Sequence, residues 1–140
     1  MKKILNDLIG ITGYTIKNKK YLYQPDENLI KSMKHFNINS VIDVGANKGQ
    51  FAINLFKNKF IGDILSFEPL KQEHEILKEL SKNKKNWKIE RRCALGKKKC
   101  KKKFFISGNR ESSSLLNILP KHTNLRPESK TTNTIITEVD

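Results

Sequence analysis

The chain has 140 residues, which suffices for one domain with a hydrophobic core but not for two ordinary domains. Its net charge of +14 raises the question of a nucleic-acid partner, yet only four of its 28 basic residues are arginines, the type that such surfaces favour. Twelve of the 28 lie within residues 82–103, so the charge is local and a dedicated nucleic-acid role is disfavoured.

The cysteines and the N-terminal residues indicate the cellular compartment of the protein. Cys93 and Cys100 lack the C-x-x-C spacing and the neighbouring histidines of a zinc site. The apolar stretch behind the first lysines is interrupted by Asn6 and Asp7, unlike the core of a signal peptide. No apolar run approaches the roughly 20 residues that span a bilayer. We therefore expect a cytoplasmic protein with reduced thiols, no metal and no transmembrane segment.

The first 37 residues are predicted to form an N-terminal helical segment. A short amphipathic helix opens the chain, and a second helix is predicted over 26–36. There Asp26 is a candidate N-cap, and apolar side chains recur on one stripe. Residues 38–140 are expected to form a separate unit.

The middle of the chain alternates strands with helices. The apolar run SVIDV at 40–44 is typical of a parallel strand that is covered on both faces. After a glycine turn, the pattern predicts a helix over 50–60, a strand over 64–67, a helix over 71–83 and a strand over 87–95. Ile76, Leu77 and Leu80 are expected to face inward from the second of these helices. This order indicates an α/β fold with a parallel sheet.

The last third of the chain is predicted with less regular structure. The lysine-rich run 97–103 is interpreted as a solvated hairpin tip that joins strand 87–95 to a short strand over 104–106. A weak contact of this run with an anionic surface stays open. Residues 107–130 are expected to form a long loop, and residues 132–140 a final strand.

The distinctive residues fall where the predicted parallel strands end. Asp43, Glu68 and the pair Ala94 and Leu95 close the first, second and third strands, respectively. Ligands of open parallel sheets bind beyond these carboxyl ends. Gly45 and Gly49 would let the backbone turn tightly and lie against a ligand.

The two acids indicate the kind of ligand. A phosphate would be repelled by Asp43, by about 4 kcal/mol at ~4 Å and an effective dielectric constant of ~20, so this position suits an amino or sulfonium group. Glu68 stands where a carboxylate usually accepts both ribose hydroxyls. Such a charge-assisted hydrogen bond contributes roughly 1.5–3 kcal/mol. Together they predict S-adenosylmethionine, which carries no pyrophosphate.

Four stretches resemble the N-terminal part of FkbM-family methyltransferases in order and spacing: VIDVGANKGQFA, GDILSFEP, CALG and SSSLL. The resemblance covers about residues 38–140 and implies a Rossmann-like class I methyltransferase fold that uses S-adenosyl-L-methionine. It implies methylation of a hydroxyl on a sugar or secondary metabolite. By the same resemblance Asp43, Gly45, Asn47 and Gly49 line the methionine part of the cofactor, Glu68 binds the ribose, and Ala94 and Leu95 lie near the adenine.

The chain also departs from the family pattern. The family carries mixed or acidic residues where this chain has the run 97–103, and its next apolar strand, ending in D-x-E-G, would follow Asp140. We therefore expect a truncated parallel sheet with flanking helices, present as a fragment whose own activity is open. No residue can be assigned as catalytic.

The sequence is also compatible with two other functions. In a nicotinamide-dependent oxidoreductase Glu68 would serve equally well, but GANKG is not G-x-G-x-x-G and Asp43 would face a pyrophosphate. The other is a basic binding module or an inactive remnant. Simpler roles also exist for single residues: Asp43 could cap the following helix, Cys93 is expected to be a small buried side chain, and the three histidines are expected to be solvated or in the core.

Overall fold

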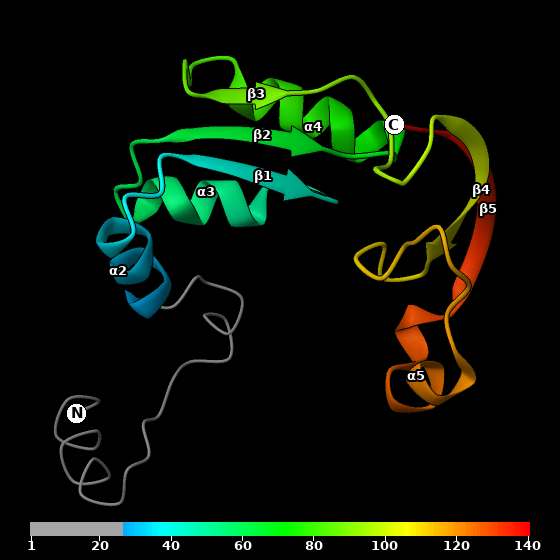
Figure 1. Ribbon diagram of the computed structural model, residues 1–140. Helices are drawn as coiled ribbons and strands as arrows, with labels where there is room; N and C mark the ends of the chain where they lie inside the picture. Colours follow the sequence, from blue (N-terminus) through cyan, green and yellow to red (C-terminus); the bar gives the residue numbers. More distant parts are fainter. Residues whose placement is uncertain (1–26) are drawn as a thin grey trace, which may run out of the picture.

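A computed structural model describes residues 27–140 (Figure 1). The predicted first helix and the candidate cap Asp26 lie outside these residues. The described elements are, in order, α2 (Glu27–His35), β1 (Ser40–Val44), α3 (Gln50–Lys57), β2 (Asp63–Phe67), α4 (Lys71–Ser81), β3 (Trp87–Ile89), β4 (Cys100–Ser107), α5 (Pro120–Leu125), the 3-10 turn η2 (Pro127–Ser129) and β5 (Thr131–Val139).

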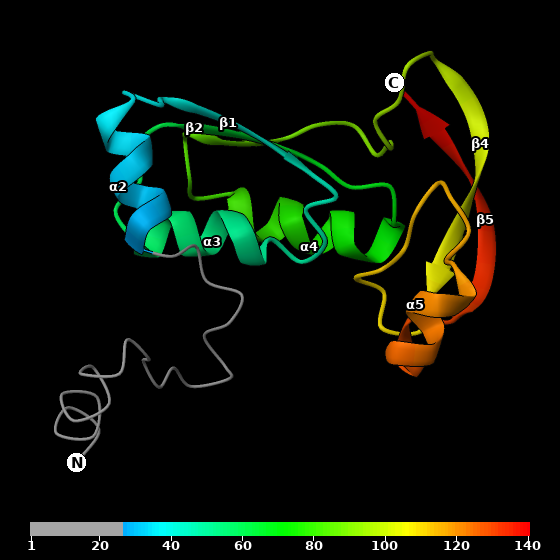
Figure 2. The same ribbon diagram turned by 60° about the horizontal axis from the view of Figure 1, so that its bottom comes forward.

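β1, β2 and β3 form a parallel sheet in that order, called here the first sheet. Val41 is in register with Ile64, and Ile64 with Trp87. The crossover helices α3 and α4 lie side by side on one face of this sheet (Figure 2). The predicted α/β fold with a parallel sheet and flanking helices is confirmed at this level.

The main core fills the space between these helices and the sheet. The apolar spacing of α3 directs Ala52 and Leu55 inward, where they are fully buried with Ile64 and Leu77. The indole of Trp87 belongs to the same core, and its ring centroid lies 5.8 Å from that of Phe56. This core holds α3 and α4 against the three parallel strands.

The opposite face of the first sheet is open within the described residues. Ile42 and Val44 point away from the helices and are 66% and 60% exposed. Among the described residues, strand 40–44 is therefore covered on one face only, because both crossover helices lie on the same side. Leu80, expected to face inward, is also exposed, since the buried stripe of α4 runs through Glu73, His74 and Leu77.

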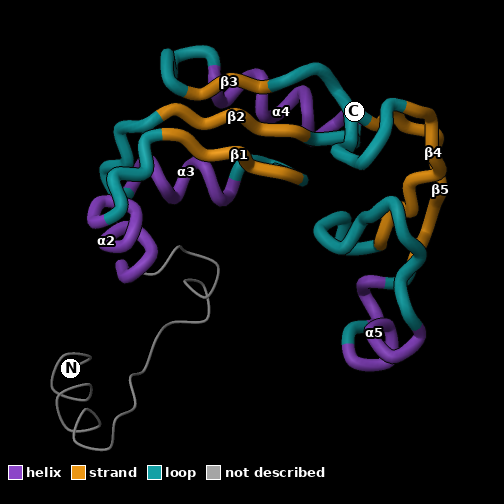
Figure 3. Tube along the Cα trace, viewed as in Figure 1, coloured by secondary structure: helices purple, strands orange, loops and turns teal. Residues whose placement is uncertain are grey.

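β4 and β5 form a separate antiparallel pair, the β4–β5 ribbon (Figure 3). Cys100 is in register with Val139, and the register shifts between Ile106 and Ser107. The predicted hairpin is wrong: residues 100–103 belong to β4 itself, whose partner is the distant β5. The predicted strand 87–95 ends at Ile89. Ala94 instead forms an isolated parallel bridge with Val139, which joins β5 to the segment that follows β3.

A second small core joins the two parts. Leu70 and Ala94 pack there against Phe104, Ile106 and Val139 from the ribbon. The expected long loop over 107–130 contains α5 and η2, and the expected final strand is β5. None of the described helices is long and apolar enough to cross a bilayer.

Candidate functional site

A cavity of about 540 Å³ lies beyond the carboxyl ends of β1 and β2, between the first sheet and the β4–β5 ribbon. Five of the predicted site residues line it: Gly45, Asn47, Glu68, Ala94 and Leu95. Of the residues predicted to converge at the strand ends, Glu68, Ala94 and Leu95 do line one cavity, although Ala94 and Leu95 lie beyond the end of β3 at Ile89. Asp43 and Gly49 do not line the cavity, so their predicted cofactor contacts stay predictions.

The turn after β1 depends on left-handed backbone conformations. Gly45, Asn47 and Gly49 have φ angles of 73°, 48° and 80°, a region that glycine and asparagine tolerate best. The backbone N–H groups of Gly45 and Ala46 both donate to the carbonyl of Phe67, at 2.9 and 3.0 Å. The turn is therefore tied to the end of β2.

The two glycines differ in their surroundings. A Cβ on Gly45 would meet no atom within 4 Å, because this residue faces the cavity. A Cβ on Gly49 would stand 2.8 Å from Cη2 of Trp87 and 3.0 Å from Cδ2 of Leu77. Gly49 is thus required where α3 begins against the core.

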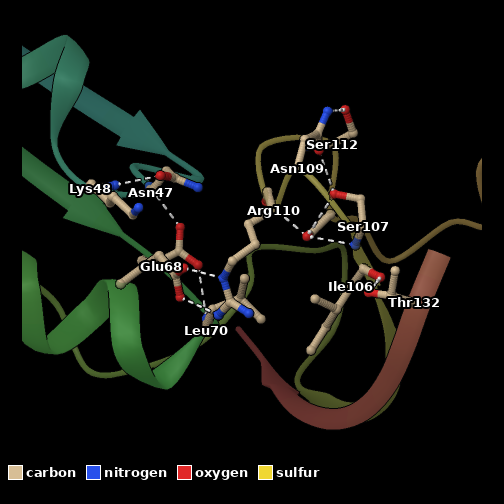
Figure 4. Close-up of polar contacts among 12 residues, drawn as sticks. Asn47, Lys48, Glu68, Leu70, Ile106, Ser107, Asn109, Arg110, Ser112 and Thr132 are labelled. Atoms are coloured by element: carbon tan, nitrogen blue, oxygen red, sulfur yellow. Dashed lines mark hydrogen bonds and ion pairs between the residues drawn. The ribbon is translucent and has the colours of Figure 1, made fainter. Parts of the chain in front are cut away.

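Glu68 is the central polar residue of the cavity (Figure 4). Its Oε2 accepts a hydrogen bond from the N–H of Asn47 and its Oε1 one from the N–H of Leu70, both at 2.8 Å. The residue is only 4% exposed, and within the described residues its carboxylate forms no ion pair. Burial raises the pKa of Glu68, although the two hydrogen bonds oppose that shift. Each oxygen keeps a free lone pair for a ligand donor.

Asp43 lies on the helix-facing side of β1. Its Oδ2 accepts a hydrogen bond from the hydroxyl of Ser66 at 3.2 Å, and Ser66 Oγ accepts one from Nε1–H of Trp87 at 2.9 Å. Burial raises the pKa of Asp43, partly offset by the bond from Ser66. The capping alternative is wrong, because Gly49 is the N-cap of α3 and no side chain caps it.

The wall beyond β2 is apolar. Ala94 and Leu95 line it, together with Leu70, Phe104 and Leu115. Cys93 also lines it and is fully buried, which confirms the expected small buried side chain. Burial raises the pKa of its thiol, which disfavours the nucleophilic thiolate.

The outer wall is a loop over residues 108–116, called here the wall loop, whose role the sequence did not reveal. From it Arg110 donates through Nε and Nη2 to the two carboxylate oxygens of Glu73 in α4, with 2.7 Å between Nη2 and Oε2. The carboxyl side chain of Glu73 is 0% exposed. The two residues are 37 positions apart, so no local pattern could have predicted their contact.

Hydrogen bonds between residues close in sequence shape the wall loop (Figure 4). The N–H of Ser107 donates to Ser113 Oγ at 3.1 Å, and the hydroxyl of Ser113 donates to the carbonyl of Arg110 at 2.8 Å. Asn109 Oδ1 accepts from Ser107 Oγ and from the N–H of Ser112, at 2.7 and 3.0 Å. The serine run therefore has a structural role.

The histidines have the expected solvated or core positions. Nε2 of His74 is 2.7 Å from the carbonyl of Glu90 in the interior, whereas His35 and His122 are exposed. Among the described residues, no group of three His, Cys, Asp or Glu side chains could hold a metal ion. Comparisons of the chain with family models, with curated proteins and with solved structures find no significant match.

Proposed function

We propose that the cavity binds the adenosyl group of S-adenosylmethionine, and that residues 38–140 are the cofactor-binding part of an FkbM-type methyltransferase with a Rossmann-like class I fold. The observation that carries the proposal is the carboxylate of Glu68. It is buried and forms no ion pair among the described residues, yet it stands on a cavity wall at the end of β2. A buried charge of this kind is costly unless donors satisfy it.

The lining of the cavity fits the cofactor. The two neighbouring hydroxyls of a ribose would supply the donors that Glu68 can still accept, and its two backbone hydrogen bonds already fix its orientation. The apolar wall with Ala94 and Leu95 offers a surface for the adenine ring. Gly45 and Asn47 would lie along the methionine part, where the turn brings the backbone close.

The charges of the lining support a cationic nucleoside. Because Arg110 is paired with Glu73, the remaining charged side chains at the cavity are Glu68, Glu111 and Lys102, with a negative balance. A sulfonium and an ammonium group suit that balance better than a pyrophosphate does. Asp43 and Gly49 would act by shaping the turn. When bound, the cofactor supplies an electrophilic methyl group for an acceptor hydroxyl.

Calorimetric titration of the full chain with S-adenosylhomocysteine tests the proposal. We expect binding, and a loss of affinity of roughly tenfold or more in Glu68→Gln, because the charge-assisted bonds to ribose are weakened. Glu75→Gln is the control: it removes one negative charge at an exposed position of α4 that does not line this cavity, and it should leave the affinity nearly unchanged. A folded chain that binds NAD but not S-adenosylhomocysteine would contradict the proposal.

A further inference from the structure

We propose that Arg110 is a positioning residue for the cavity: its two-pronged contact with Glu73 keeps the wall loop against α4, so that the loop forms the wall opposite Glu68. This inference rests on the proposed function for the identity of the ligand. The closure of the cavity itself is a property of the chain alone and can be measured without any ligand.

The contacts of the wall loop single out Arg110. The loop is bonded to its own ribbon through Ser114, whose N–H and carbonyl exchange hydrogen bonds with Phe105 at 3.0 and 2.8 Å. The N–H groups of Gly108 and Asn109 bond to Lys130 and Glu128 in the same part of the chain. The Arg110–Glu73 contact, in contrast, leads from the loop to the helix beside the first sheet.

The geometry of the contact favours a fixed wall. Arg110 has a φ of 60°, which is uncommon for a residue other than glycine and directs its side chain across the cavity edge. A guanidinium that meets a carboxylate with two parallel hydrogen bonds is restricted in both direction and distance. Because Glu73 is fully buried, loss of Arg110 would leave an unpaired internal charge.

The same pair acts on Glu68. The positive charge of Arg110 lowers the pKa of Glu68, whereas the negative charge of Glu73 raises it. Glu111 and Lys102 are the other charged side chains on the cavity wall. Loss of Arg110 removes a contribution that lowers the pKa of Glu68, so while Glu73 stays ionised Glu68 is protonated at a higher pH. Arg110 thus positions the wall and also favours the ionised carboxylate that a ribose requires.

Hydrogen exchange of the ligand-free chain tests the closure. In Arg110→Gln we expect faster exchange within residues 108–116 and around Glu73, with the β1 and β2 amides unchanged. Arg110→Lys, which keeps the positive charge but cannot form the two parallel hydrogen bonds to Glu73, should show a smaller increase in exchange rate. The double variant Arg110→Gln/Glu73→Gln, which leaves no buried charge unpaired, provides the same test if the single variant fails to fold. Unchanged exchange of the wall loop in a folded variant would overturn the proposal.

Titration with S-adenosylhomocysteine between pH 5 and 8 tests the effect on the site. We expect Arg110→Gln to bind about tenfold more weakly at pH 7, and the loss of binding at acid pH to begin at a higher pH than in the unmodified chain. Arg110→Lys should keep the original pH profile. If the affinity of Arg110→Gln for S-adenosylhomocysteine falls by the same factor at every pH, Arg110 has a purely structural role. That result would overturn the proposed effect of Arg110 on the ionisation of Glu68. If the unmodified chain binds no S-adenosylhomocysteine, the proposed function fails, and hydrogen exchange alone decides the closure.

Discussion

The carboxylate of Glu68, at the end of β2, accepts the backbone N–H of Asn47 in the turn after β1, with 2.8 Å between Oε2 and the nitrogen. The two residues are 21 positions apart and come from different loops. Their bond fixes the glycine turn relative to the carboxylate, so the two parts of the cavity that the sequence singled out form one rigid corner.

The two glycines of the turn should respond differently to alanine. Gly45→Ala should cost about 1–2 kcal/mol of unfolding free energy, because only the left-handed backbone is strained and no atom lies within 4 Å of the new methyl. Gly49→Ala should cost roughly 1–3 kcal/mol more, because its methyl would also collide with Trp87. Urea unfolding of both variants measures the difference, and equal losses would contradict the packing role of Gly49.

Asp43 should make the stability depend on pH in a defined direction. Its pKa is raised in the folded chain, so the stability associated with the neutral acid is present below pH 3.8 and is lost as the pH rises through the raised value. Asp43→Asn keeps an acceptor for Ser66 and carries no charge. We therefore expect this variant to be more stable than the unmodified chain at pH 7, with the gap closing towards pH 4 and below.

Chemical denaturation at pH 7 and pH 4 compares the two proteins. Glu111→Gln serves as the control for removal of one negative charge, because Glu111 is exposed. An Asp43→Asn variant that is less stable at pH 7 would show that the ionised carboxylate stabilises the fold, contrary to this account.

Ser66 connects Asp43 to Trp87, and its removal should be costly. Ser66→Ala leaves the indole N–H of Trp87 without its partner in the core and should lower the unfolding free energy by about 1–3 kcal/mol. In the background Trp87→Phe, which has no N–H, the same substitution should cost less. A double-mutant cycle measured by urea unfolding gives the coupling, and additive losses would mean that the hydrogen bond contributes nothing.

Local elements of the first sheet could be predicted because their signals are local. The spacing of Ala52 and Leu55 defines one face of α3, and Glu68-Pro69 marks the end of β2. The meeting of Gly45 and Glu68 at one cavity then follows from parallel strands that end on the same edge, whereas Ala94 is held there by its bridge to Val139.

The parts of the fold and of the cavity that could not be predicted depend on contacts between residues far apart in the sequence. The lysine-rich segment 100–103 lies in β4 because β5 pairs with it, and Lys101 is 3.5 Å from Glu138 of that strand. The run SVIDV is nearly continuous in apolar residues, so alternation could not show whether Asp43 or Val44 faces the helices. Arg110 and Glu73 meet only after the ribbon folds back onto α4.

A structure of the chain with bound S-adenosylhomocysteine tests the central claim most directly. This account predicts that both ribose hydroxyls lie within about 2.6–3.2 Å of the carboxylate oxygens of Glu68, with the adenine against Ala94 and Leu95. A ligand found instead in the separate cavity between α2 and the start of β2, or bound with no contact to Glu68, would contradict it.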